Sequence, residues 1–102
     1  MPVRDLDVAR IADAVATLAV EACTYLGDDV SGFFRAALAK EESETGRDIF
    51  QQLLDNAALA RESGMPLCQD TGLAVVFLEI GQDVHLTGGD LEEAVNEGVR
   101  RG

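Results

Sequence analysis

The amino-acid sequence predicts an α+β fold with a helical first half, a loop, one or two strands and a C-terminal helix. Two observations carry this prediction. Apolar residues recur at helical spacing through residues 4–64, whereas a continuous apolar run with β-branched and aromatic residues begins at Leu73. Gly64 and Pro66 stand between the two patterns, where a helix is expected to end.

Three helices are predicted in the first half. The first covers residues 4–26, which have an alanine-rich body with no internal Gly or Pro. A shorter second helix is predicted over residues 30–43. Thr45 and Asp48 have the spacing of a capping box before a third helix, which Gly64 ends.

The second half changes to strand patterns. The run "LAVVFLEI", residues 73–80, is apolar at all but one position and predicts a well-buried strand. "DVHLT", residues 83–87, predicts a second short strand. Asp90 caps a final helix whose acidic start and basic end suit the helix dipole.

These elements divide the chain into a helical part (1–64), a motif loop (65–72) and a strand-and-helix part (73–102). A sheet of one hairpin is marginal without further strands. We therefore expect the 102 residues to be a fragment of a larger α/β domain that completes its sheet elsewhere.

Composition restricts the function. The net charge of −11 argues against binding nucleic acid or anionic membrane, because both require clustered cations. An anionic ligand would likewise need positive groups from elsewhere. No apolar run approaches the roughly 18 residues that span a bilayer, and no basic leader precedes an apolar stretch. Two cysteines without a secretion signal predict reduced thiols and a cytoplasmic location.

The residues with chemical potential gather in the loop, where Cys68, Gln69 and Asp70 are consecutive. Cys68 can be a small buried hydrophobe, a metal ligand or a nucleophile. Gln69 carries a donor and an acceptor for a ligand carboxylate or hydroxyl, and Asp70 is either a turn former or a general acid. His85 is the only histidine and is expected to be a half-exposed strand residue, whereas Cys23 is expected to be structural.

The stretch "GMPLCQDTG", residues 64–72, resembles the first signature of class I, iron–sulfur-dependent fumarate hydratases and L-tartrate dehydratase α subunits. The helix "LLDNAALARES" before it, the run "LAVVFLEIG" after it and "LEEAVNEGVRRG" are similar to the family's flanking segments. The resemblance covers most of the chain from about Ile49 onward and is more specific than the bare loop composition.

This resemblance implies a [4Fe–4S] cluster bound by three cysteines, with one open iron acting as a Lewis acid. Cys68 matches the first cluster ligand, Gln69 matches a residue that hydrogen-bonds the substrate carboxylate, and Asp70 matches an acid beside the substrate hydroxyl. The other two cysteine ligands are absent from the sequence, so we expect the isolated chain to be inactive. Arg100 and Arg101 suit a helix C-terminus and a substrate contact equally well.

The leading hypothesis is the N-terminal segment of a hydro-lyase that interconverts fumarate and malate, or its tartrate counterpart. Its expected partners are a dicarboxylate substrate, the remainder of the α domain, a β subunit or domain, and further copies in a homo-oligomer. An alternative is a helical assembly or dimerisation module without catalytic activity, because the alanine-rich helices suit packing against a partner. A thiol-based redox protein is a third reading.

Overall fold

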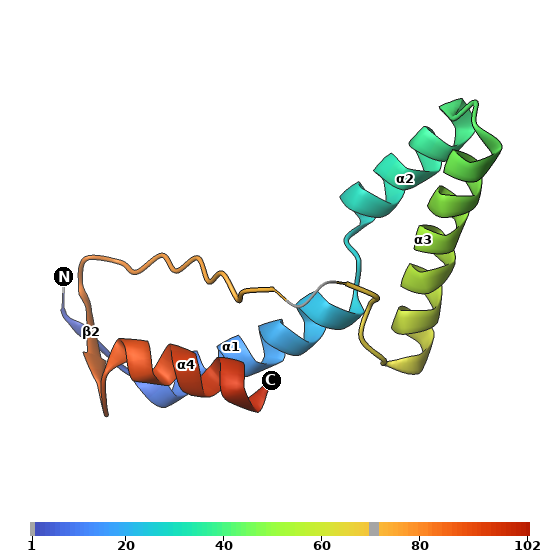
Figure 1. Ribbon diagram of the computed structural model, residues 1–102. Helices are drawn as coiled ribbons and strands as arrows, with labels where there is room; N and C mark the ends of the chain where they lie inside the picture. Colours follow the sequence, from blue (N-terminus) through green and yellow to red (C-terminus); the bar gives the residue numbers. More distant parts are fainter. Residues whose placement is uncertain (1, 70–71) are drawn as a thin grey trace. The chain divides into compact units, whose positions relative to one another are not determined.

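The computed structural model describes residues 2–69 and 72–102, and it confirms the predicted α+β class. The elements in Figure 1 follow in the order β1 (Arg4–Asp7), α1 (Val8–Thr24), α2 (Asp28–Lys40), α3 (Glu44–Ser63), β2 (Val84–Thr87) and α4 (Leu91–Arg101). Of the helices in these described ranges, none is long and apolar enough to cross a membrane.

The chain divides into two compact units. The first unit comprises Met1–Val20 and Thr71–Gly102, and the second comprises Glu21–Asp70. The first contains the two strands, most of α1 and α4, whereas the second contains the end of α1, α2, α3 and the start of the motif loop.

The first unit contains a two-stranded parallel sheet, in which Arg4 pairs with Val84 and Asp7 with Thr87. The predicted strand over 83–87 is thus confirmed as β2. The predicted start of the first helix at residue 4 is wrong, because residues 4–7 pair with β2 instead. The Asp7 carboxylate accepts a hydrogen bond from the backbone N–H of Ala9 at 2.9 Å, so α1 begins only after this aspartate.

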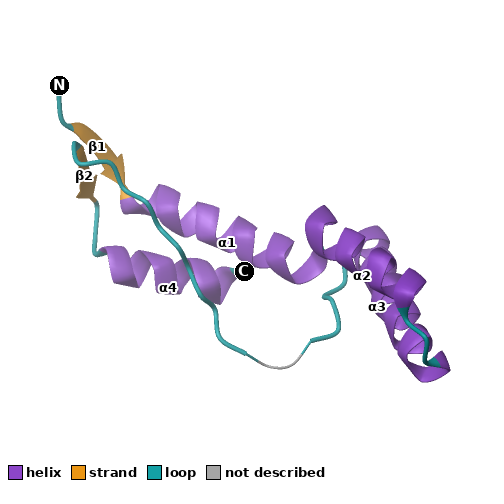
Figure 2. Cartoon of the chain, turned by 90° about the horizontal axis from the view of Figure 1, so that it is seen from above, coloured by secondary structure: helices purple, strands orange, loops and turns teal. Residues whose placement is uncertain are grey.

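The core of the first unit lies where α1 packs against α4 and β2. Val8, Ala12 and Ala94 are buried, and the partly buried Leu86 packs against them. A Cβ on Gly98 would lie 2.6 Å from the carbonyl oxygen of Ala12, so only glycine permits this approach of the two helices. Figures 1 and 2 both show α4 beside the first turns of α1.

The final helix begins as predicted. The side chain of Asp90 accepts a hydrogen bond from the backbone N–H of Glu93 at 3.1 Å and caps α4. Acidic side chains occupy the first turn and arginines the last, which matches the helix dipole.

The predicted buried strand over residues 73–80 is wrong for the chain as described. These residues form no strand and are exposed, and they are drawn as loop in Figure 2. A run that is apolar on both faces needs neighbouring strands and covering layers to become a buried strand. The sheet that the structure describes pairs only β1 with β2, so it supplies neither.

In the second unit α2 and α3 form a helical hairpin, in which the rings of Phe34 and Phe50 lie 6.2 Å apart. The third helix starts earlier than predicted, because the Ser43 side chain, not that of Thr45, caps it by accepting a hydrogen bond from the backbone N–H of Gly46 at 3.2 Å. Gly64 ends the helix as predicted, in the left-handed conformation with φ 70°.

Candidate functional site

The motif loop leaves the end of α3, and two hydrogen bonds attach its backbone to the second unit around Cys68. The backbone N–H of Leu67 donates to the carbonyl oxygen of Cys23 at 2.6 Å. The backbone N–H of Cys68 donates to the side-chain oxygen of Asn56 at 2.9 Å. One bond comes from the end of α1 and the other from the side of α3, so the backbone on either side of the Leu67–Cys68 peptide is held in place.

Cys68 itself is exposed and carries a free thiol. The thiol is therefore open to a ligand that approaches from outside the described chain, and it is not the buried hydrophobe that one reading of the sequence allowed. The backbone of this residue is fixed while its side chain remains accessible. A metal-ligating thiol needs this combination, because the ligand atom must be positioned without being covered.

Gln69 is also exposed, next to Cys68 in the chain. Its amide can donate and accept hydrogen bonds, as a contact to a carboxylate requires. Asp70, the predicted acid, lies outside the described residues, as does Thr71. The structure therefore places two of the three predicted site residues.

Asn56 is a site residue that the sequence analysis missed. It lies in the middle of α3, half-buried, and accepts the hydrogen bond from Cys68 across a separation of 12 residues. Asparagine is a poor helix former, because its side chain competes for backbone hydrogen bonds. An asparagine inside the run "LLDNAALA", which is apolar apart from Asp55 and Asn56, was the signal that could have identified it.

Cys23 differs from its predicted structural role, because its thiol is exposed and free. Its contribution to the loop is the backbone carbonyl that accepts from Leu67. The side chain is not needed for that contact. The alanine-rich pattern around Cys23 indicated a packed face, but the end of α1 leaves this residue uncovered.

The donor set fits one ligand of a metal cluster. Across residues 2–69 and 72–102, no group of three or more His, Cys, Asp or Glu side chains is arranged to hold a metal ion. Cys68 offers a single accessible sulfur, which is suitable as one ligand of an iron–sulfur cluster. The remaining ligands of such a cluster would have to come from outside the described residues.

The other ionisable residues singled out from the sequence lie in the first unit. His85 is on β2, exposed as expected, with its Nδ1 atom 3.2 Å from the Asp5 carboxylate. Arg101 donates to the Asp13 carboxylate on α1 at 3.0 Å. Arg100 donates to Glu97 at 2.7 Å, and this hydrogen bond lowers the pKa of the Glu97 carboxyl. Both arginines therefore have roles within the helix pair.

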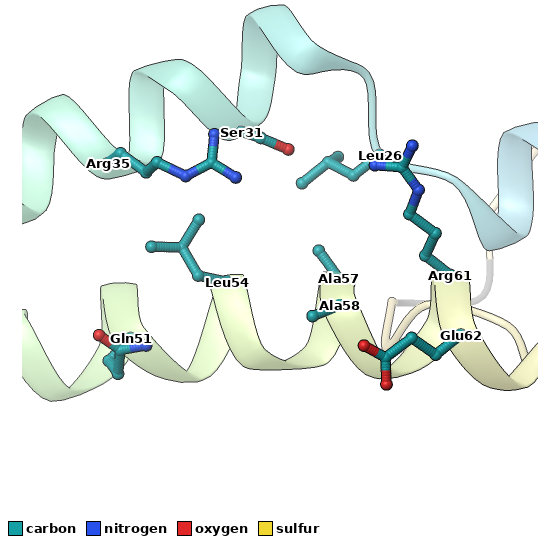
Figure 3. A pocket seen from close by; sticks show the side chains of 9 residues that line it. All are labelled: Leu26, Ser31, Arg35, Gln51, Leu54, Ala57, Ala58, Arg61 and Glu62. Carbon is teal, nitrogen blue, oxygen red and sulfur yellow. The ribbon is translucent and has the colours of Figure 1, made fainter.

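A groove of about 420 Å³ lies between α2 and α3 in the second unit. Figure 3 shows the side chains of Arg35 from α2 and Arg61 from α3 along this groove, whose apolar lining is Leu54, Ala57 and Ala58 of α3 together with Leu26, which precedes α2. Arg61 also stacks over the ring of Tyr25 at 4.7 Å, so part of its charge is directed to an aromatic face. None of residues 65–69 is among the groove-lining residues, so the groove is separate from this described part of the motif loop.

Comparison with known proteins adds the context of these residues. The family model described as fumarate hydratase (Fumerase) matches residues 12–102. The putative L(+)-tartrate dehydratase subunit alpha of Methanocaldococcus jannaschii is 37% identical over 93 residues, which cover 90% of this chain and 33% of that protein. The L(+)-tartrate dehydratase subunit alpha of Escherichia coli K12 is 30% identical over 92 residues, covering 90% of this chain and 30% of the relative.

A shorter match joins the chain to the anaerobic class I fumarate hydratase of Escherichia coli K12. It is 41% identical over 59 residues, which cover 58% of this chain and 11% of that enzyme. The chain thus spans about a third of the length of the tartrate dehydratase subunits that it matches. No solved structure matches the chain significantly.

Proposed function

The chain belongs to the fumarate hydratase (Fumerase) family, as its "CQDTG" motif predicted, and on that premise we propose that it is the N-terminal part of a hydro-lyase α subunit. The reaction is the reversible addition of water to fumarate to give malate, or the removal of water from tartrate. The observation that carries the proposal is the motif loop, in which an accessible thiol stands on a backbone tied down by Asn56 and Cys23.

In this proposal Cys68 provides one thiolate ligand of a [4Fe–4S] cluster, and the other two cysteines come from outside these 102 residues. When bound, such a cluster supplies a Lewis-acidic iron. Gln69 binds a carboxylate of the substrate through its side-chain amide and orients the dicarboxylate. Asp70 gives a proton to the departing hydroxyl in dehydration and takes one from water in hydration.

The charge of the chain supports a shared site. The net charge of −11 makes the chain alone a poor host for a dianionic substrate. The cations that neutralise both carboxylates would come from the remainder of the subunit or from its β partner. We therefore propose that the 102 residues by themselves neither hold a complete cluster nor turn over substrate.

The test is a pair of cysteine variants in the intact enzyme. Cys68→Ser should abolish the iron–sulfur absorbance, because the cluster loses a thiolate ligand. Cys23→Ser should leave it unchanged, because the backbone carbonyl that holds the loop remains. A normal cluster in the Cys68→Ser enzyme would refute the proposal.

The role of Asp70 requires a separate variant. Asp70→Asn should preserve the cluster and substrate binding, and should lower turnover by a factor of about 100 to 10,000, the usual share of a general acid. Unchanged turnover would remove the acid role while leaving the cluster ligand in place.

A second candidate function, as an assembly module, is favoured by the exposed apolar side chains of the helical hairpin, among them Phe33, Ile49 and Leu59. Such residues on one hairpin suit packing against a partner protein. The solution mass of the chain, measured with and without the remainder of the enzyme, discriminates between the two functions. A stable self-association of the chain, together with no loss of cluster in the Cys68→Ser enzyme, would favour assembly alone.

A further inference from the structure

The most exposed apolar segment in the described chain is the run that directly follows the motif loop. Leu73 is 93% exposed, Val75 69% and Phe77 92%. Folded proteins rarely leave three such apolar side chains uncovered at alternate positions of one segment, because removing apolar surface from water stabilises the fold. We therefore expect another protein surface to cover this segment.

Exposure along this run alternates with a period of two. Between and after the three open residues, Val76, Leu78 and Ile80 are only 41%, 47% and 41% exposed. Alternation of this kind is characteristic of an extended strand whose successive side chains point to opposite faces. Val76, Leu78 and Ile80 are thus the less exposed set of side chains, and Leu73, Val75 and Phe77 form the more open face.

The backbone of the run is likewise without a sheet partner. The described sheet pairs residues 4–7 with 84–87 only. Among the described residues, no backbone hydrogen bond joins residues 73–80 to another segment. An extended apolar segment with free backbone N–H and C=O groups is the geometry that accepts an added strand.

Two observations indicate which segment covers residues 73–80. The tartrate dehydratase α subunits that match this chain are about three times as long, so most of such a subunit lies outside these residues. A second copy of the chain is disfavoured, because two chains of charge −11 repel each other. The occupant that suits a run apolar on both faces is an interior strand of a larger sheet, buried on both sides.

We propose that residues 73–80 become a strand by pairing with a β-strand from the remainder of the same α subunit, and that Leu73, Val75 and Phe77 pack against its covering layer. This inference rests on the proposed membership of a longer α subunit. It adds that the loop is anchored on both sides. Asn56 holds the loop before the motif cysteine, and the new strand pairing holds the chain just after residue 72.

Amide hydrogen exchange tests the pairing. The amides of residues 73–80 should exchange without protection in the 102-residue chain, and should slow by roughly a hundredfold or more in the complete α subunit. Absence of protection in the complete subunit would overturn the proposal. Protection in the isolated chain that appears only as a dimer forms would also overturn it, in favour of a second copy.

A matched pair of variants in the complete subunit ties the protection to the open face. Phe77→Asp should remove the protection of residues 73–80, because a buried carboxylate opposes the packing. Leu18→Asp changes an exposed leucine on α1 in the same way and should leave this protection intact. Equal protection in both variants would contradict the predicted packing face. If Phe77→Asp yields no folded subunit, Phe77→Ala supplies the same comparison with a partial loss.

The protection of residues 73–80 is expected to be independent of the iron–sulfur cluster. Exchange measured on the Cys68→Ser subunit should show the same protection of residues 73–80 as the unmodified subunit. Protection without an effect of Cys68→Ser on iron–sulfur absorbance would uphold the strand pairing and refute the proposed function. Loss of the cluster in Cys68→Ser, with no protection of residues 73–80 in the complete subunit, would support the proposed function and refute the strand pairing.

Discussion

The two units of the chain are similar in length but are stabilised differently. The first unit contains nearly all of the buried apolar residues, which are Val8, Ile11, Ala12, Val15 and Ala94. In the second unit, the buried residues are only Ala60 and Ser31 within the described chain. The first unit is stabilised by close packing of its helices. The second is stabilised by helix caps and by a contact between two aromatic rings, and an open groove lies between its two helices.

This difference bears on the site, because the motif loop is tied to the unit with the smaller core. Local stability in proteins follows buried apolar contact, and sites often lie at the less stable end. Two hydrogen bonds hold the loop backbone around Cys68. The position of Cys68, the candidate metal ligand, therefore depends on backbone hydrogen bonds, whereas the unit that contains the strands depends on apolar packing.

The largest expected effect comes from filling the closest contact of the first unit. In Gly98→Ala the new methyl group would lie 2.6 Å from both the Ala12 carbonyl oxygen and the Val15 Cβ atom. Neither can move cheaply, so the first unit should lose about 1–3 kcal/mol of stability, the usual cost of overpacking. Hydrogen exchange should rise in α4 and the start of α1 while the second unit is unaffected. An equal rise in amide exchange in both units would show that the two units are not stabilised independently.

A smaller effect is expected from the polar anchor of the loop. Asn56→Leu removes the acceptor for the Cys68 N–H and should cost about 0.5–1.5 kcal/mol locally, the net value of one hydrogen bond. Asn56→Asp keeps an oxygen at that position and should restore the protection. The measurement is the exchange rate of the Cys68 amide. If the leucine and aspartate variants exchange equally, Asn56 is not a positioning residue.

Gly32→Ala on α2 is the counterpart of the glycine variant in the first unit. No atom lies within 4 Å of the position of a new Cβ, so the methyl group enters open space. Alanine is the better helix former, and the second unit should gain about 0.5–1 kcal/mol. Thermal unfolding followed by helical circular dichroism measures the change. A loss of stability would show that the hairpin packs more tightly than its groove indicates.

The smallest effect is a pH dependence confined to the first unit. The hydrogen bond from Arg100 lowers the pKa of the Glu97 carboxyl in the folded chain. This contribution to stability is therefore present above the unfolded-state pKa and is lost as the pH falls through the lower folded-state value. Both side chains are solvent-accessible, so the contribution of this ion pair to the free energy of unfolding is small. Glu97→Gln should flatten this part of an acid titration of α4 helicity, and an unchanged titration would contradict the assignment.

Much of the fold and part of the site could be predicted from local pattern. The caps at Asp90 and Gly64 depend on residues close in sequence, so composition and spacing were sufficient. The strand pattern of β2 was also visible in its own residues, although its partner was not. Cys68 and Gln69 were identified by their motif, and the family to which the motif points is confirmed. The roles of these two residues and of Asp70 stay predictions.

The contacts between distant segments could not be predicted in this way. Helical spacing continues back to residue 4, yet Arg4–Asp7 pair with residues 84–87 because strand hydrogen bonds compete with the first turn of a helix. The Asn56 contact to Cys68 and the approach of Gly98 to Ala12 likewise join segments far apart in the chain. The spacing of Gly98 and Gly102, small residues four apart, was the available sign of close helix packing.

The amino-acid sequence by itself determined the existence of the helices, the caps at Asp90 and Gly64, the acidic charge and the cysteine motif, because these follow from local propensity and composition. Only the tertiary structure decided which residues hold the loop backbone and which are buried. It also decided that residues 73–80, although patterned as an interior strand, are extended and uncovered. A strand is defined by its neighbours, and hydrogen bonds between strands cannot form until a partner is present.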